Sequence, residues 1–141
     1  MRKNIVIAAF IMIVLCFFLA GCKQDPKVEM TASYATARSQ FKAVTGLEVP
    51  AYADLEVDAF PYQEGDDSYC FDIIGGNAVS YQMYLNFENF FKEKLGNPDS
   101  ATGDEANGRD VQWTKGGRWY QTYWDNTNEA IYLNTNLVPM S

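Results

Sequence analysis

Residues 5–20 form an uninterrupted apolar run (IVIAAFIMIVLCFFLA), which limits the part of the chain that can fold as a water-soluble domain. Arg2 and Lys3 precede the run, and Leu19-Ala20-Gly21-Cys22 ends it. With about 16 residues, the run is shorter than the roughly 20 that an α-helix needs to cross the hydrocarbon core of a bilayer. A basic head, a short apolar core and a small-residue exit are typical of an export signal. We therefore expect residues 1–21 to be a signal peptide that is removed.

The end of this run resembles the lipobox of bacterial lipoproteins, Leu-Ala-Gly-Cys. The resemblance covers residues 1–22 and implies that Cys22 becomes the first residue of the mature chain, with a diacylglycerol on its thiol. A thiolate is the nucleophile that such a transfer requires. Two or three acyl chains anchor a protein stably, at about 0.8 kcal/mol per buried CH₂, whereas one chain does not. The alternative is an uncleaved N-terminal membrane anchor.

The same resemblance implies that the protein is exported and held on a membrane by lipid. The membrane would be the outer membrane of a Gram-negative cell or the extracytoplasmic face of the cell membrane in a Gram-positive one. Residues 22–33 carry the expected lipid and are otherwise mostly polar, which favours a flexible tether. Residues 34–141 then form a single domain, because a mature chain of about 120 residues suffices for one hydrophobic core.

Charge and composition exclude several classes of function. The chain has a formal net charge of −7, and removal of the leader with Arg2 and Lys3 makes the mature chain still more negative. An acidic chain argues against a nucleic-acid partner. There is no histidine, which excludes Ser-His-Asp and Cys-His nucleophile pairs and histidine-bound zinc. We expect a protein that is not an enzyme and holds neither a cofactor nor a metal.

The cysteines predict no internal disulfide. Cys16 leaves with the leader and Cys22 is lipidated, so only Cys70 remains in the domain. Cys70 lies between Tyr69 and Phe71 in a strand-like run and has no base or cation nearby in sequence. This context favours a packed, inert thiol over a reactive one.

Hydrophobic periodicity and turn residues predict two helices and six strands. Apolar residues at three- and four-residue steps indicate a helix over 34–45, ended by Gly46, and a second from an N-cap at Asn86 to Leu95, with Glu88 near its positive end. Alternation predicts strands over 53–59, 68–74, 78–85, 109–114, 118–125 and 129–137. Gly75-Gly76-Asn77 suggests a hairpin that joins the second and third strands, and residues 97–108 suggest a polar loop.

This order indicates an α+β fold, in which an antiparallel sheet carries both helices on one face as a two-layer sandwich. The order helix-strand-strand-strand occurs twice, with a period near 50 residues, and predicts a tandem α-β-β-β repeat over 34–85 and 86–138. Such an architecture is loosely similar to β-lactamase-inhibitor and outer-membrane-assembly lipoprotein folds, which bind other proteins. That likeness is one of architecture and rests on no shared motif.

The sheet face without helices is the candidate binding site. Alternation assigns one set of side chains to the core, namely Val111, Trp113, Tyr120, Thr122, Trp124, Ile131 and Leu133. The opposite face then shows aromatic and amide side chains: Gln112, Trp119, Gln121, Tyr123, Tyr132, Asn134 and Asn136, with Asp54, Glu56, Asp58, Asp72, Ser80, Gln82 and Tyr84 from the first half. Trp and Tyr dominate protein interfaces, because they bury much area at low entropic cost.

Three functions are compatible with this face. The first is a non-catalytic module that docks a protein partner in the cell envelope, with Trp119, Tyr123, Tyr132, Gln121, Asn134 and Asn136 as binding residues. The second is a binder of glycans or small ligands, because sugar rings stack on aromatic side chains while amides bind hydroxyls. The third and most remote is a hydrolase that uses the carboxylates at 54, 56 and 58. Acidic turns at 64–67 and 125–129 lack EF-hand spacing, and we interpret them as solvated turns.

Overall fold

The computed structural model describes residues 28–59, 69–75 and 79–137. The leader, Cys22 and the turn at 64–67 lie outside the described residues, so the predictions made on them remain predictions. Among the residues described, no helix has both the length and the apolar character needed to cross a bilayer.

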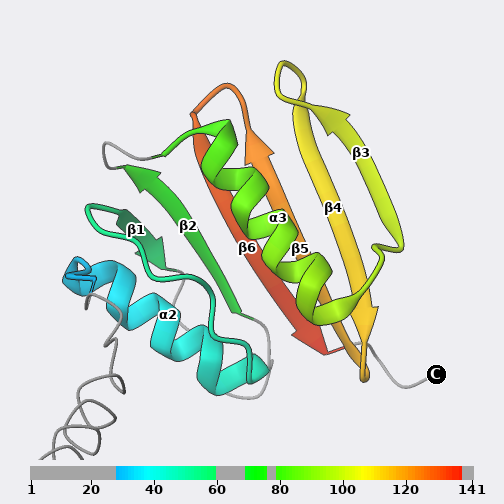
Figure 1. The fold of residues 1–141 in the computed structure, drawn as a ribbon, viewed down its shortest axis with the longest axis horizontal. Coiled ribbons are helices and arrows are strands. Elements are labelled where there is room, and N and C mark those ends of the chain that lie inside the picture. The colour runs from blue at the N-terminus through cyan, green and yellow to red at the C-terminus, as the bar shows by residue number, and fades with distance from the viewer. Residues whose placement is uncertain (1–27, 60–68, 76–78, 138–141) are drawn as a thin grey trace, which may run out of the picture.

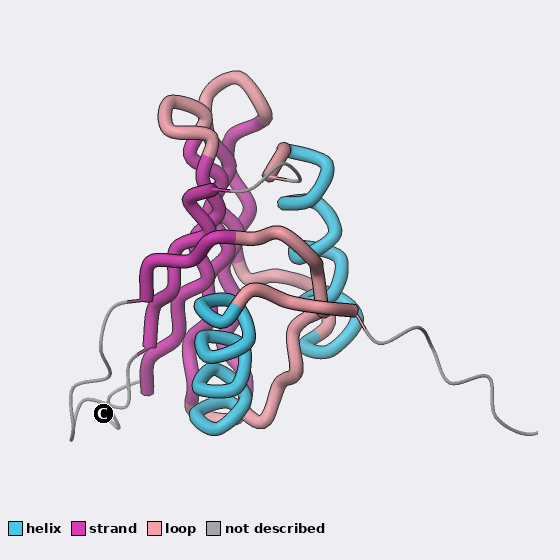
Figure 2. Tube along the Cα trace, turned by 90° about the vertical axis from the view of Figure 1, so that its left-hand side faces the viewer, coloured by secondary structure: helices cyan, strands magenta, loops and turns pink. Residues whose placement is uncertain are grey.

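Two helices and six strands make up the described chain (Figure 1). In chain order they are α2 (Ala32–Thr45), β1 (Glu56–Ala59), β2 (Tyr69–Gly75), α3 (Tyr81–Leu95), β3 (Ser100–Asp104), β4 (Gly108–Lys115), β5 (Arg118–Asp125) and β6 (Ala130–Leu137). The strands form one antiparallel sheet in the order β1-β2-β6-β5-β4-β3. Both helices lie on the same side of the sheet, which confirms the α+β sandwich (Figure 2).

Each helix begins at a hydroxyl side chain that binds a free backbone N–H group. Thr31 caps α2 by accepting from the N–H of Tyr34, and Ser80 caps α3 by accepting from the N–H of Met83, both at 3.2 Å. Gly46 ends α2 with a φ of 75°, a conformation that glycine adopts at little cost. The apolar stripes then turn inward and place the most buried helical side chains against the sheet: Tyr34, Ala37 and Phe41 on α2, and Tyr84, Phe87 and Phe91 on α3.

The core between the layers is aromatic. All seven residues that alternation assigns to the core in the second half are at most 5% exposed, which confirms the predicted faces of β4, β5 and β6. Phe91 of α3 stacks on Trp113 of β4 with ring centroids 5.6 Å apart, and meets Phe41 of α2 edge-on at 6.1 Å. Such pairs stabilise by about 0.5–1.5 kcal/mol beyond the area that they bury, so these rings fix the spacing of helices and sheet.

The strand predicted over 78–85 is wrong. These residues contain the N-cap Ser80 and the first turn of α3, so the helix begins at Tyr81 and Asn86 lies within it. The hairpin pairing predicted across 75–77 is wrong as well, because β2 pairs with β1 and β6. Tyr84, expected on the open face, is fully buried in the core.

The tandem α-β-β-β order is not observed. The described chain runs helix, two strands, helix, four strands, and the expected boundary between repeats at 85 and 86 falls inside α3. The loop expected over 97–108 contains the edge strand β3, which pairs with β4. The additional strand and the longer second helix remove the match between the two halves.

A buried ionic cluster joins α3 to β4. Glu88 is 2% exposed, and Arg109 donates to both of its carboxylate oxygens, from Nε at 2.7 Å and from Nη2 at 2.9 Å. Lys92 adds a contact of 2.6 Å from the next helical turn. The predicted interaction of Glu88 with the positive end of a helix is wrong, because seven residues of α3 precede it.

Gly103 allows the two backbones of the β3–β4 hairpin to approach closely. Its φ is 79°, and a Cβ built there would lie 1.9 Å from the carbonyl oxygen of Gly108. We expect Gly103→Ala to lower the free energy of unfolding by about 2 kcal/mol or more, because the left-handed conformation and the clash both oppose a side chain. Gly116→Ala is the matched control, since Gly116 also has a positive φ but no atom within 4 Å of the added Cβ. Equal losses for the two variants in urea denaturation would contradict the role of the close approach.

Candidate open-face site

The six predicted binding residues lie together on the face of the sheet that carries no helix. They form three directly opposed pairs between β5 and β6: Trp119 with Asn136, Gln121 with Asn134, and Tyr123 with Tyr132. Asn136 is exposed, and the other five are half-buried. The predicted faces of β5 and β6 are therefore correct, since the residues that alternate with these six are the buried ones.

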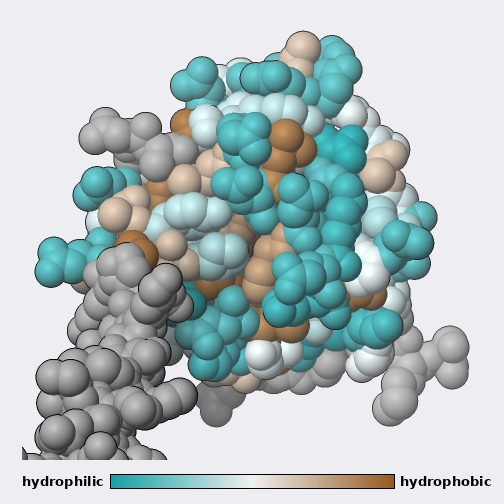
Figure 3. All heavy atoms as spheres, viewed as in Figure 1, coloured by the Kyte–Doolittle hydropathy of each residue, from teal (hydrophilic) through white to brown (hydrophobic). Residues whose placement is uncertain are grey.

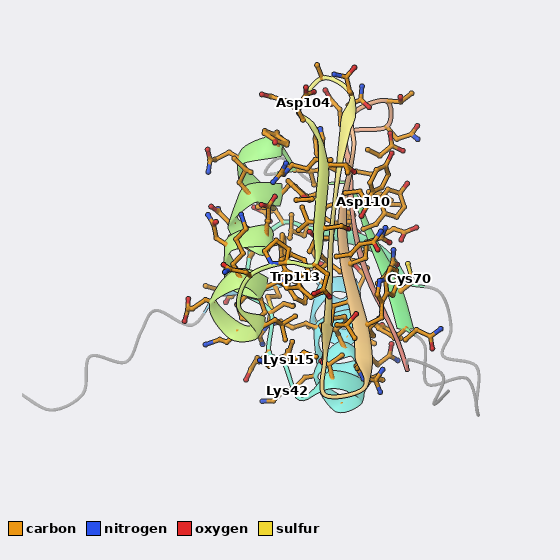
Figure 4. All side chains as sticks on the ribbon, turned by 90° about the vertical axis from the view of Figure 1, so that its right-hand side faces the viewer. Lys42, Cys70, Asp104, Asp110, Trp113 and Lys115 are labelled. Carbon is orange, nitrogen blue, oxygen red and sulfur yellow. The ribbon has the colours of Figure 1, made fainter. Side chains whose placement is uncertain are left out.

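We call this surface the open face and define it by the outward side chains of the four central strands: Cys70 and Asp72 on β2, Asp110 and Gln112 on β4, Trp119, Gln121 and Tyr123 on β5, and Tyr132, Asn134 and Asn136 on β6. Figure 4 shows Asp110 and Cys70 on this side of the sheet and Trp113 on the side of the helices. None of the described helices covers the open face (Figure 2).

Two tyrosines form the aromatic centre of the face. The rings of Tyr123 and Tyr132 lie 5.7 Å apart with a tilt of 41°. Asp72 on β2 is directly opposite Tyr132, and Asp110 on β4 is directly opposite Tyr123. Burial, and then the charge of Asp72, raises the pKa of Tyr132. The Tyr132 phenol is therefore neutral at physiological pH and offers a ring face and a hydroxyl donor.

Hydrogen bonds link the amides into a fixed row across three strands. Asn134 Nδ2 donates to Gln121 Oε1 at 2.8 Å, and Gln121 Nε2 donates to Asp110 Oδ2 at 2.9 Å. From the other side, Gln112 Nε2 donates to both oxygens of Asp110 at 3.2 Å, and Trp119 Nε1 donates to Gln112 Oε1 at 3.3 Å. We call these five residues the amide row. Because their side chains are already ordered, a ligand would lose little entropy by fixing them.

Asp110 accepts from both glutamines of the row, and sequence reasoning missed it. It stands two residues before Gln112 on the same strand, so the alternation that placed Gln112 on the open face also places Asp110 there. Its carboxylate accepts hydrogen bonds from two amides and keeps further lone pairs on each oxygen.

Cys70 lies on the open face beside Asp72. Its Sγ donates to Asp72 Oδ1 at 3.2 Å, and burial followed by the Asp72 charge raises the pKa of the thiol to about 12. A thiol with this pKa remains protonated at neutral pH and does not react as a thiolate. The inert thiol that the sequence suggests stays a prediction, which this environment favours.

The acidic turn at 125–129 uses its leading carboxylate internally. Asp125 accepts from the backbone N–H of Thr127 at 2.9 Å and from Asn128 Nδ2 at 2.8 Å. The β3–β4 turn repeats the arrangement, with Asp104 accepting from the N–H and Nδ2 of Asn107 at 2.9 Å. Across the described ranges, no group of three or more potential metal-ligating side chains occurs. These hydrogen bonds are those by which an aspartate stabilises a tight turn.

The carboxylates considered for hydrolysis lie at the sheet edge. Asp54 precedes β1 with a φ of 57°, and Glu56 begins that strand; both are exposed. The side chain of Asp58 lies outside the described part. The helix side of the domain shows mainly hydrophilic side chains, with hydrophobic ones visible between them (Figure 3).

Comparison with protein-family models, with curated proteins and with solved structures gave no match for this chain.

Proposed function

We propose that this chain is a lipid-anchored protein of the bacterial cell envelope that docks a protein partner through its open face. The observation that carries the proposal is the set of three cross-strand pairs between β5 and β6, in which Trp and Tyr rings alternate with amides. Rigid aromatic side chains surrounded by hydrogen-bonding groups are what protein interfaces use as hot spots.

The tether enters the domain on the side opposite the open face, which leaves the open face accessible to a partner. Residues 28–31 enter the domain on the helix side of the sheet, opposite the open face (Figure 2). Met30 packs against the core and Thr31 caps α2, so this entry point is fixed to the fold. The segment from Cys22 to Val28 extends at most about 20 Å. Acylation at Cys22 would thus keep the helix side nearer the bilayer and direct the open face away from it.

A photo-crosslinking residue at Asn136 tests the docking function in native membranes. Asn136 is exposed at the margin of the open face, next to Trp119, and it lies outside the amide row. We expect a discrete adduct with one envelope protein, and about a tenfold or larger loss of that adduct when Tyr123 and Tyr132 are both replaced by Ala.

The matched control places the same crosslinker at Glu93, which is 74% exposed on α3. Thermal unfolding of the double variant checks that both tyrosine substitutions leave the fold intact. An adduct of equal yield from both positions, or none from Asn136, would contradict docking through the open face.

Glycan binding is the second candidate, and the hydrogen bond made by the indole of Trp119 favours it. The indole N–H of Trp119 already donates to Gln112, so the ring surface is what remains for a ligand, and sugars stack on such surfaces. Trp113 and Trp124 are at most 5% exposed, so a change in tryptophan fluorescence on ligand addition reports Trp119. If cell-wall fragments quench the tryptophan fluorescence saturably, and Trp119→Ala abolishes this quenching, glycan binding would be favoured over docking of a protein.

A further inference from the structure

The open face and the helix side differ in where the positively charged side chains lie. Every Lys and Arg in the described ranges lies on a helix or at a strand position that faces the helices. Arg38 and Lys42 belong to α2 and Lys92 and Lys94 to α3, while Arg109, Lys115 and Arg118 alternate with the outward-facing residues of β4 and β5. Figure 4 shows Lys42 and Lys115 near the same end of the domain, away from Asp104.

The helix-side cations are mostly matched by carboxylates of the same side. Arg38 and Lys42 pair with Glu48, and Lys92 and Arg109 pair with Glu88. The open face carries Asp110, which is half-buried, and Asp72, which is 8% exposed, and among the described residues of this face there is no cation. Asp110 is half-buried and, within the described part of the chain, accepts only from neutral amides, so its charge favours a positively charged partner at this face and disfavours an acidic one.

The carboxylates and rings of this face are arranged in one line. Adjacent strands place Asp72, Tyr132, Tyr123 and Asp110 side by side in that order. With strands about 4.8 Å apart, the two carboxylates flank the tyrosine pair across about 14 Å. A cation over a tyrosine ring is attracted within about 6 Å of its centroid. A basic side chain lying on the tyrosines thus also comes within reach of a carboxylate.

We infer that the partner segment seated on the open face is cationic and places an arginine over Tyr123 and Tyr132, with its guanidinium directed to Asp110. This inference rests on the proposed docking function and names the chemistry of the partner. Arginine fits better than lysine, because its planar guanidinium stacks on a ring and binds a carboxylate through two N–H groups at once. The amide row holds Asp110 in place before the partner arrives.

A short Gly-Arg repeat peptide tests the inference with the full-length lipidated protein in nanodiscs of phosphatidylcholine, a lipid without net charge. The comparison peptide carries citrulline in place of arginine, which keeps the size and removes the charge. We expect the arginine peptide to change Trp119 fluorescence saturably and to bind at least about tenfold more tightly than the citrulline peptide. Added salt should weaken the binding of the arginine peptide and leave the binding of the citrulline peptide unchanged.

Asp110→Asn and Glu93→Gln form the matched pair of variants. Each removes one negative charge, on the open face and on α3 respectively, and asparagine at 110 can still accept from the amide row. We expect Asp110→Asn to lower the affinity for the arginine peptide about tenfold and Glu93→Gln to leave that affinity unchanged. Thermal unfolding of both variants confirms that any loss is not a loss of fold.

Three results would overturn the inference: equal binding of the citrulline peptide, equal weakening by Glu93→Gln, or no binding of the arginine peptide. Crosslinking from Asn136 separates these failures from failure of the proposed function. An adduct that persists unchanged in Asp110→Asn would support the docking function and contradict the inference that the partner segment is cationic. Absence of the adduct in the native chain would remove both.

Discussion

The variant Arg109→Met is expected to unfold about 3 kcal/mol more easily than the native chain at neutral pH. Methionine keeps much of the apolar length of arginine and removes both hydrogen bonds to Glu88, which is 2% exposed. A buried carboxylate that loses its main partner is costly, because the interior cannot replace the lost solvation. Lys92 still contacts Glu88 at 2.6 Å, which places the loss toward the lower end of the range for broken buried pairs.

The pH dependence of this loss follows from the pKa of Glu88. Burial raises that pKa, but hydrogen bonds from Arg109 and Lys92 outweigh burial and lower it from 4.5 to about 2. A carboxyl group with a lowered pKa in the folded state adds stability above its unfolded pKa and loses it as pH falls toward the folded value. Urea denaturation between about pH 5 and pH 2 should therefore show the native chain and Arg109→Met converging.

Lys92→Met is the control for a general loss of charge near Glu88. Lys92 contacts the same carboxylate but is 41% exposed, so its removal should cost less than about 1 kcal/mol. Replacing Glu88 and Arg109 together with Met should recover most of the stability, because no buried charge is then left alone. A loss in Arg109→Met no greater than that in Lys92→Met would contradict this account.

The faces of β4, β5 and β6 could be read from the sequence for a physical reason. An antiparallel sheet with helices on one side alternates apolar and polar residues strictly, and two short turns preserve the register. The β4–β5 turn consists of Gly116 and Gly117, both with positive φ, which is the two-residue geometry that matches strand twist. This part of the chain supplies all six binding residues that the sequence predicted.

The start of α3 was predicted as a strand because two periods overlap there. Val79, Tyr81, Met83 and Leu85 alternate, whereas Tyr81, Tyr84, Glu88, Phe91 and Leu95 follow helical spacing over a longer stretch. The helical period prevails, since the Ser80 cap and the burial of Tyr84 against β5 stabilise the helix from its first turn. A capping serine before the run was the available signal.

Other features depend on contacts between distant segments. All five residues of β3 are exposed, so this edge strand has no hydrophobic alternation that sequence could reveal. Its position is set by pairing with β4. The contact between Glu88 and Arg109 joins a helix to a strand 21 residues away, and neither residue type predicts burial. The outermost strand and the buried ion pair therefore emerge only from the fold.

We expect acylation at Cys22 to be complete in the native chain and absent from the variant Cys22→Ser. Mass spectrometry of protein from native membranes measures it. We expect the native chain to begin at Cys22, to lack Met1, and to carry the added mass of a diacylglycerol. Cys22→Ser should retain residues 1–21 without lipid, because a serine hydroxyl is far less ionised than a thiol and is a poor nucleophile for this transfer. The retained apolar run would then hold the variant at a membrane, so the mass distinguishes the two forms where fractionation does not.

Cys16→Ser is the matched control, since it alters a thiol of the leader and leaves Leu19-Ala20-Gly21-Cys22 unchanged. It should be processed and acylated like the native chain. An intact Met1 in the native protein, or lipid on Cys22→Ser, would contradict acylation at this position. The outcome also bears on the open face, because two or three acyl chains at Cys22 hold the tether end stably at the bilayer. The helix side, where residues 28–31 enter, would then stay near the membrane, and the Tyr123–Tyr132 pair would be presented on the opposite side.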